Sequence, residues 1–433
     1  MTAAKCCSFS AGAEQPLYRV AYFCRYEDRL SLTSGACENF RAALQAAGMP
    51  AVPGDFSVVP RHQLIPGAIL AEIAAFIAAF DRVTGRDGWQ TAALRAAPAI
   101  AQLRRKEVCF FSAWDFHLPP GGGWQLIEFN DNGSGFLFAA IINALYCQTA
   151  GLRQDGQITA PAAIAEFNNG VGAMVENEAV SYFGARPTDL FVVLDDSESL
   201  QQGKFRRELE LLCALLRQRG FRAELGCPAE LRWDGDRLLL RDKAVSFIVN
   251  RSTDFFWRSE DFSALRSAYQ GGRVYVAPNP FSYATRSDKR LLERLALPHW
   301  DQELQIRPAE RQIFSAHVPE THLIRAENLQ ALAQRKQEFA FKPLHGFAGR
   351  GLLDSAAVGR ARLRRLTTHS EGYVAQKWVP KPSMETDGAP LWTDLRVWAY
   401  SGKIFHLSGR ASRRPDRLDL TPAGGWLPTY AAL

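Results

Sequence analysis

The chain has 433 residues, which is too long for one ordinary domain, so two or three lobes that share a cleft are expected. Hydrophobic residues make up 47% and charged residues 22% of the sequence. This ordinary globular composition excludes a disordered, collagen-like or repeat protein. The net charge of +6 is modest and the arginines are scattered, so the balance favours an enzyme with anionic small-molecule substrates over a nucleic-acid-binding protein.

The cysteines and apolar stretches bear on the compartment. Eight cysteines occur, none in a CxxC motif and none spaced with histidine as in a zinc finger. The N-terminal segment lacks the continuous apolar core of a signal peptide. The longest apolar stretches, 69–80 and 136–146, are shorter than the ~20 residues that a membrane span needs. A reduced, cytoplasmic protein without a membrane partner is expected.

Helix and strand signals alternate along the N-terminal part of the chain. Two apolar segments predict buried helices, and two segments rich in aromatic and β-branched residues predict strands joined by the turn sequence Pro119–Gly123. The signals weaken over 150–185, where a domain seam is expected. The expected elements are a helix over 66–80, strands over 108–116 and 124–129, and a helix beginning at Phe136.

Alternating strands and helices follow. The run 190–194 is continuously apolar, as in a parallel strand that is buried on both faces. A helix with one apolar face ends before Gly220, a residue suited to helix termination. These features predict a small open α/β sheet. Its expected strands are 190–194, 221–225, 245–249 and 274–276, and the helix face is formed by Phe205, Leu209, Leu212 and Leu216.

The last part of the chain again mixes short strands with helices, and Ser401–Lys403 is a hairpin turn sequence. The expected fold class is therefore mixed α/β. Three parts are expected: an N-terminal lobe over 1–185, a small open-sheet domain over 186–280 and a C-terminal lobe over 281–433. The strands expected in the last part are 321–324, 339–343, 373–377, 394–400 and 403–408.

Three polar residues on the predicted hairpin form a candidate metal site. Because side chains alternate along a strand, Glu128 and Asn130 project from the same face, and Asp115 lies opposite them if the hairpin pairs across its turn. Carboxylate and amide oxygens suit Mg²⁺, which also keeps room for water and phosphate oxygens. The alternative is a solvated acidic face. The apolar neighbours of Glu128 and the polar elbow Asn130–Gly133 argue against that alternative.

A glycine-rich segment follows the strand expected over 339–343. Lys342 stands at the strand end, where it would add a point charge, and glycines allow backbone N–H groups to approach a phosphate closely. The segment lacks the GK[ST] triplet of a Walker A loop and does not fit GxGxxG. The alternative is an ordinary turn, and the lysine favours a nucleotide. The glycines are Gly346, Gly349 and Gly351.

In their joint order, these segments resemble the ATP-grasp superfamily. In that family an Asp and a later Glu-x-Asn, which hold magnesium, come last, whereas here they occur upstream as Asp115 and Glu128–Asn130. This displacement is similar to the circularly permuted branch of glutathionylspermidine synthase-like proteins and eukaryotic-type glutathione synthetase. Ser287 is the expected N-cap of the first helix of the motif series. The segments are Asp288-Lys289, Val318–His322, Phe341–Pro343, Val374–Val379 and Asp394–Val397, with an intervening domain marked by Leu194–Asp196 and Ala277–Phe281.

The resemblance implies a circularly permuted ATP-grasp fold with a small inserted α/β domain, and it implies ATP and two magnesium ions as cofactors. Asp115 and Glu128 would bind magnesium, with Glu128 bridging both ions and Asn130 completing the second. Lys289 and Lys342 would contact the ATP phosphates. The adenine would meet Gln376, Lys377 and Val379, and Gly349 and Gly351 would lie in the loop over the phosphates.

The implied activity is ATP-dependent ligation of a carboxylate to an amine through an acyl phosphate. Relatives often place an arginine two residues before the metal-binding Asp, where this chain has Ala113. Arg410 and Arg413 are the candidates to supply that charge, although their basic run also fits a solvated turn. Two alternatives stay open: a kinase that phosphorylates a small-molecule hydroxyl, and a catalytically degenerate ATP-binding module. The sequence identifies neither the acid nor the amine.

Overall fold

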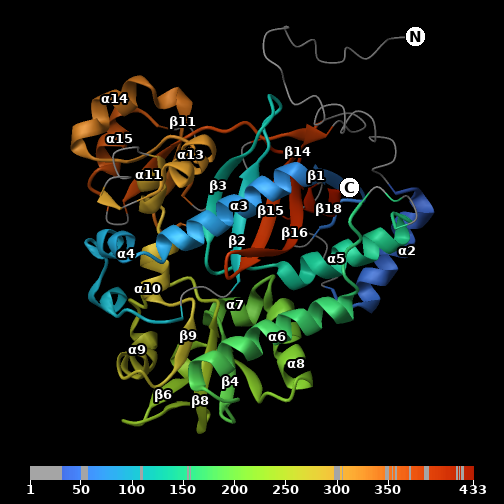
Figure 1. The fold of residues 1–433 in the computed structure, drawn as a ribbon, viewed down its shortest axis with the longest axis vertical. Helices are drawn as coiled ribbons and strands as arrows, with labels where there is room; N and C mark the ends of the chain where they lie inside the picture. The colour runs from blue at the N-terminus through green and yellow to red at the C-terminus, as the bar shows by residue number, and fades with distance from the viewer. Residues whose placement is uncertain are drawn as a thin grey trace.

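The protein, described here from a computed structural model, has a mixed α/β fold built of β-sheets with flanking helices (Figure 1). This confirms the predicted fold class. The described residues are 32–49, 57–107, 111–153, 156, 158–296, 303–304, 306–346, 351–353, 355, 358–369, 372–384, 390–415, 418, 420 and 424–433.

The largest sheet is antiparallel and joins residues from distant parts of the chain. β2 pairs with β15, so Asp115 stands opposite Arg396, 281 residues away in sequence. β3 lies on the outer side of β2, which makes the predicted hairpin an edge of the C-terminal sheet. The spatial order is β13 (Ser383–Met384), β14 (Leu391–Thr393), β16 (Lys403–Ser412), β15 (Leu395–Tyr400), β2 (Ser112–His117) and β3 (Gln125–Asn130), with β17 (Gly425–Leu427) also paired to β16.

Helices cover both faces of this sheet (Figure 1). Alternate residues of β2 belong to two different cores, because Ala113 packs with the α5 side and Trp114 with the α3 side. On the α3 side, Phe76 and Phe80 meet the Trp114 ring edge-on. The two predicted helices are confirmed. The elements are α3 (Gly67–Thr84), α4 (Asp87–Leu94), α5 (Phe136–Thr149), α2 (Ser34–Ala46), and the parallel pair β1 (Gln63–Pro66) and β18 (Thr429–Ala432).

A second sheet has a parallel centre, in which β8 pairs with β4 and β9 and β4 pairs with β5. Its strands lie inside the predicted 186–280 segment, and the domain limits themselves stay a prediction. Gly220, with φ +82°, ends α8: its N–H and that of Phe221 donate to the carbonyls of Arg217 and Leu216. The elements are β4 (Leu190–Leu194), β5 (Ala223–Gly226), β6 (Leu231–Trp233), β7 (Leu238–Leu240), β8 (Lys243–Asn250), β9 (Tyr275–Ala277), α7 (Ser197–Gln202), α8 (Arg206–Gln218) and α9 (Ser263–Gln270).

A third, three-stranded sheet forms the small lobe at the upper left of Figure 1. β12 lies between β10 and β11, and its end leads back toward the largest sheet. Phe341, Val358 and Leu363 are fully buried in its core. The elements of residues 280–377 are β10 (Thr321–Leu323), β11 (Phe339–Pro343), β12 (Tyr373–Lys377), α10 (Pro280–Ser282), α11 (Arg290–Ala296), α13 (Pro308–His317), α14 (Leu329–Gln334) and α15 (Arg360–Leu366). Of these, α10 lies below the small lobe in Figure 1.

The segment 150–185, where weak signals predicted a seam, holds the 20-residue helix α6 (Ile164–Phe183). The sequence hid this helix because it contains two glycines and buries only a narrow stripe. Gly172 lies on that stripe, and a Cβ there would stand 2.0 Å from Cδ of Arg219 on the neighbouring chain segment. The glycine therefore permits close packing of α6 against α8.

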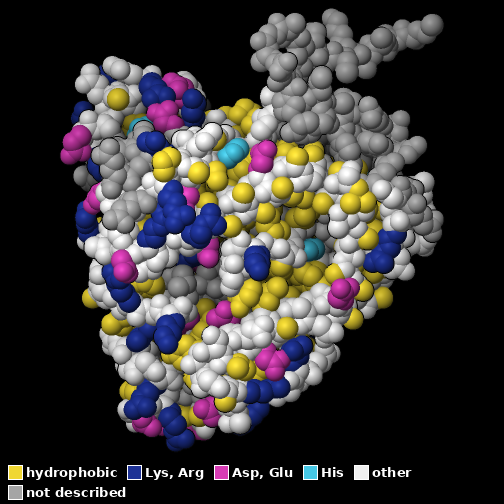
Figure 2. All heavy atoms as spheres, viewed as in Figure 1, with side chains coloured by type: hydrophobic (Ala, Val, Ile, Leu, Met, Phe, Trp, Pro, Cys, Tyr) yellow, Lys and Arg dark blue, Asp and Glu magenta, His cyan; other side chains and the backbone are white. Residues whose placement is uncertain are grey.

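On the face in Figure 2, Lys and Arg side chains are spread over several areas between apolar and acidic ones. Within the described residues, no helix is both long enough and apolar enough to pass through a membrane.

Candidate functional site

The β2–β3 hairpin holds the predicted acidic residues on one face. Asp115 stands directly opposite Glu128, and Ala113 stands opposite Asn130. A bulge after Asp115 resets the alternation, so that Phe116 faces Leu126 toward the core. The geometry predicted for Asp115, Glu128 and Asn130 is confirmed. Their role as metal ligands stays a prediction.

Asp115 is buried between two arginines. Arg396 donates Nε and Nη2 to the two carboxylate oxygens, each at 2.6 Å, and Arg410 donates Nη2 to Oδ2 at 2.7 Å. Burial alone would raise the pKa of Asp115, but the two guanidinium groups hold it well below its usual range. Arg410 also pairs with the buried Asp394, at 2.5 Å. The predicted candidate Arg410 therefore does reach the acidic site.

Arg396 was not predicted as a site residue. Its signal in the sequence was the alternation Asp394-Leu395-Arg396 along a strand, which places both charges on one face. The pairing of β2 with β15 brings that face against Asp115, and the sequence does not indicate this pairing. Arg413, the other predicted candidate, lies exposed just after β16. The structure therefore gives the two arginines of the predicted pair different environments.

Glu128 and Asn130 fit a magnesium ion better than Asp115 does. Glu128 Oε1 lies 3.4 Å from Lys289 Nζ, and this carboxylate accepts no hydrogen bond within the described residues. Asn130 lines a hollow and is partly exposed. Asp115, by contrast, has both oxygens engaged by arginine. The donor set therefore fits one ion held by Glu128 and Asn130, whereas Asp115 could join only if its ion pairs opened.

Two lysines from separate segments converge on the hairpin. Lys342, on β11, donates to the Ile127 carbonyl at 3.1 Å and to Gln376 Oε1 at 2.5 Å. Burial lowers its pKa to about 8, although Glu128 nearby favours the charged form. Lys289 donates to the Gly346 carbonyl at 2.5 Å. The predicted phosphate lysines are thus brought together beside Glu128.

The helix that follows Lys289 is capped differently from the prediction. Asp288 accepts the backbone N–H of Arg290 at 3.0 Å, so Asp288 and not Ser287 caps α11. Ser287 instead accepts the N–H of Asp131 at 3.1 Å and ties the helix start to the hairpin elbow. The predicted cap was wrong because the preceding residues continue as a buried helical turn that ends at Ser287.

The segment after β12 lies next to the hairpin as well. His117, two residues beyond Asp115, donates Nδ1–H to the Val379 carbonyl at 2.9 Å. Gln376 is buried beside Lys342, whereas Lys377 is exposed. Gly351 has φ +74°, a conformation that favours glycine, and Gly349 lies outside the described residues. Gln376 and Val379 are thus near the lysines, and His117 is a site residue that the sequence did not indicate.

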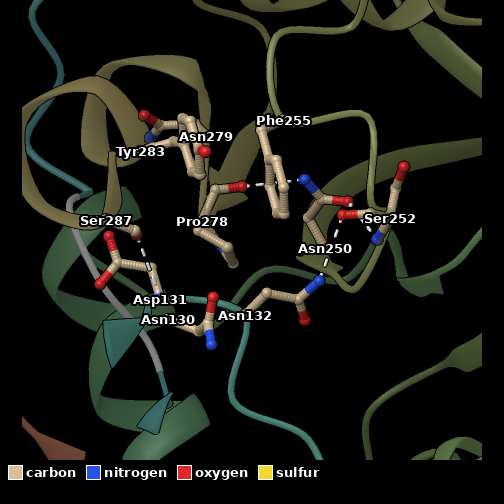
Figure 3. Close-up of a pocket in the computed structure, with 10 residues that line it drawn as sticks. All are labelled: Asn130, Asp131, Asn132, Asn250, Ser252, Phe255, Pro278, Asn279, Tyr283 and Ser287. Carbon is tan, nitrogen blue, oxygen red and sulfur yellow. Dashed lines mark hydrogen bonds between the residues drawn. The ribbon is translucent and has the colours of Figure 1, made fainter. Parts of the chain in front are cut away.

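A small polar hollow, with room for about one water molecule, opens beside Asn130 (Figure 3). Amide and hydroxyl groups surround it, and Phe255 and Tyr283 stack in parallel with ring centroids 4.2 Å apart. Asp131 on its rim lies 3.4 Å from Arg286. The sequence singled out the elbow Asn130–Gly133 and the segment Ala277–Phe281. It gave no signal for the rest of the wall, which is Asn250, Ser252, Phe255 and Tyr283. The lining residues are Asn130, Asp131, Asn132, Asn250, Ser252, Phe255, Pro278, Asn279, Tyr283 and Ser287.

Comparison with known proteins places the fold. No protein-family profile and no curated protein matches the sequence. Among solved structures, the chain is similar to a glutathione synthetase-like effector (GSS30) from Globodera pallida in its apo form, with a TM-score of 0.56 and 11% sequence identity. That similarity covers 92% of this chain and 96% of the effector. It is also similar, with a TM-score of 0.45 and 12% identity, to a protein provisionally assigned as a gamma-glutamylcysteine synthetase from Methylobacillus flagellatus KT, over 82% of this chain and 86% of that one.

At these identities the likeness concerns the fold alone. The chain shares the mixed α/β fold of the glutathione synthetase-like effector. What the site does is therefore argued from its own residues.

Proposed function

We propose that the protein is a magnesium- and ATP-dependent ligase that joins a carboxylate to an amine. The observation that carries the proposal is the convergence of Glu128, Lys289 and Lys342 from three separate segments, with Glu128 Oε1 only 3.4 Å from Lys289 Nζ. Together with neighbours in the described part of the chain, these three make a group of five cationic side chains and three carboxylates, a balance that suits a polyphosphate. The cations are Lys289, Lys342, Lys381, Arg396 and Arg410, and the carboxylates are Asp115, Glu128 and Asp394.

The chemistry follows from these positions. A substrate carboxylate oxygen attacks the γ-phosphorus of ATP, ADP leaves, and the amine then attacks the acyl carbon, losing a proton as phosphate departs. Lys289 and Lys342 would hold the phosphates in line, and Arg410 would stabilise charge on the acyl phosphate. Magnesium, when bound by Glu128 and Asn130, would neutralise charge on the phosphate oxygens. The polar groups beside Asn130 would contact the second substrate.

The chain order is part of the proposal. The hairpin with Glu128 forms the edge of a sheet whose other strands come almost 300 residues later, beyond Lys342. A circularly permuted ATP-grasp protein requires this arrangement, because the metal-binding element must return to the C-terminal sheet. The second sheet, within 186–280, is proposed as the inserted domain.

The metal assignment is tested with Glu128→Gln, which keeps the shape and removes the charge. Purified protein is given Mg-ATP with pooled amino acids and dipeptides, and ADP release is measured. The variant is expected to lose roughly 100-fold or more of any release, because an uncharged amide binds magnesium poorly. Glu327→Gln, at an exposed position on the small lobe, is the matched control and is expected to behave as wild type. Full ADP release by Glu128→Gln would refute the assignment.

A second candidate function, an ATP-binding module without turnover, is favoured by one observation. Both oxygens of Asp115 accept from arginine, and Ala113 stands where relatives often have arginine, so part of the catalytic machinery is altered. Magnesium-dependent ATP binding without ADP release from any pool would support this candidate over the ligase.

Lys342 gives a pH prediction. Since burial lowers its pKa to about 8, the free amine is only about half charged at pH 8, and ATP phosphates would favour the ammonium form. ATP binding at pH 8 is therefore expected to take up about half a proton, and affinity is expected to fall as the pH rises further. Calorimetry in buffers of different ionisation enthalpy measures this uptake. Lys342→Arg, which stays charged, is expected to abolish it, and unchanged uptake in that variant would contradict the prediction.

A further inference from the structure

The segment after β12 presents unused hydrogen-bonding groups next to the phosphate lysines. Gln376 is 2% exposed, and its Oε1 accepts from Lys342 while its Nε2 has no partner within the described structure. The backbone N–H of Val379 makes no hydrogen bond among the described residues either, whereas the N–H groups of Lys377 and Trp378 donate to the carbonyls of Glu320 and Glu338. An unpartnered buried donor is costly, so these groups point to a ligand.

His117 adds a group of the opposite kind. Its Nδ1 lies 2.9 Å from the Val379 carbonyl, which only accepts, so Nδ1 carries the hydrogen. The neutral ring therefore has an unprotonated Nε2. Among the described residues, the contact with Val379 is the hydrogen bond that His117 makes, so its Nε2 is available as an acceptor.

We propose that His117 selects adenine over 6-oxopurines by accepting a hydrogen bond from the exocyclic amino group at Nε2. This inference rests on the proposed function and names the base that the same site takes. The Val379 N–H and the Gln376 amide would donate to adenine ring nitrogens. A 6-oxopurine presents an oxygen where adenine presents an amino group, and N1–H where adenine has a lone pair. Its oxygen would face the Nε2 lone pair, and its N1–H would face the Val379 N–H, so two contacts become repulsive.

His117 has a structural role as well, because it holds the Val379 carbonyl, and the two roles need separate variants. Asparagine at this position places an amide N–H near the former Nδ1 and leaves nothing at Nε2. His117→Asn therefore keeps the contact with Val379 and removes the acceptor. His117→Phe keeps the ring volume and removes both. His369→Asn, at an exposed position after α15, is the matched control.

The test is calorimetric binding of Mg-ATP and Mg-ITP to the full chain, since inosine differs from adenosine only at position 6 and the adjacent N1–H. Wild type and His369→Asn are expected to prefer ATP about tenfold or more. His117→Asn is expected to bring the preference below about threefold, chiefly through weaker ATP binding, with a melting temperature near that of wild type. His117→Phe is expected to lose the preference and some stability.

The outcomes separate the inference from the function on which it rests. If wild type binds ATP but shows no preference over ITP, or if His117→Asn keeps the wild-type preference, the inference is overturned while the proposed function stands. If wild type binds neither nucleotide, the proposed function fails and the inference fails with it. A purely structural His117 would lower stability in both variants and leave the ATP/ITP ratio unchanged.

Discussion

Replacing Arg410 by alanine is expected to lower the free energy of unfolding by about 3–5 kcal/mol, because it leaves a buried carboxylate without its cation. The Arg410 side chain meets Asp394 at 2.5 Å and Asp115 at 2.7 Å. The Asp394 side chain is 1% exposed. Asp115 would keep Arg396, so the loss falls mainly on Asp394. Urea denaturation, followed by circular dichroism, measures the change.

The chain supplies a matched control three residues away. Arg413 belongs to the same basic run but lies exposed, and Arg413→Ala is expected to change stability by less than about 0.5 kcal/mol. A double-mutant cycle of Arg410→Met with Asp394→Asn isolates the charge pair. The backbone N–H of Arg410 donates to Asp394 Oδ1 at 2.8 Å, and the asparagine keeps an oxygen that can accept this bond. Equal losses for Arg410→Ala and Arg413→Ala would contradict the buried-pair interpretation.

Local patterns predicted much of the fold. Continuous apolar runs such as 190–194 and turn sequences such as Ser401–Lys403 determine structure within a few residues. The strands there begin within one residue of the predicted positions, but β16 continues to Ser412, four residues beyond its predicted end. Asp115 and Glu128 were placed opposite each other for the same reason, because a hairpin's pairing depends on its turn and alternation.

Contacts between distant segments were beyond such reasoning. The residues near Asp115 in sequence do not indicate that Arg396 is its partner, because the two meet only through the pairing of β2 with β15. The contact of His117 with Val379 likewise needs the small lobe to lie against the hairpin. α6 was hidden because its glycines and asparagines lower helix propensity, and packing against α5 and α8 overrides that preference. The sequence therefore predicted the residues whose chemistry suits a metal ion or a phosphate, and it did not predict the residues that hold those side chains in place.

Glu107 is the strongest case of a buried group that the proposed chemistry does not use. It is 3% exposed, and within the described structure neither carboxylate oxygen makes a hydrogen bond. Burial raises the pKa of Glu107 to about 7, and the nearby Glu178 raises it further. The backbone amides of Glu107 and Lys106 and the charge of Arg105 lower the pKa by less than burial raises it. Glu178 itself accepts from the Tyr275 hydroxyl at 3.0 Å. Glu107 is therefore held protonated below about pH 7.

The free energy of unfolding is expected to fall between pH 5 and pH 8, and Glu107→Gln is expected to remove part of that fall. A pKa of about 7 in the folded state, against 4.5 for the ordinary group, means that the folded chain binds the extra proton in this window. Stability is therefore highest below pH 4.5 with respect to this group and is lost as the pH rises toward 7, by up to about 3 kcal/mol. Asp195, whose pKa burial also raises to about 7, contributes a similar slope that the variant retains.

The measurement is urea denaturation at pH 5, 6, 7 and 8 for wild type, Glu107→Gln and the exposed control Glu198→Gln. Glutamine cannot ionise, so its cost of burial is the same at every pH, and the difference between Glu107→Gln and wild type should change steadily in favour of the variant as the pH rises. The control should run parallel to wild type, because its carboxylate stays in water in both states. Parallel curves for Glu107→Gln and wild type would mean that Glu107 is ionised in the folded protein at pH 5, and that some group near it supplies the charge or hydrogen bonds that the structure does not give it.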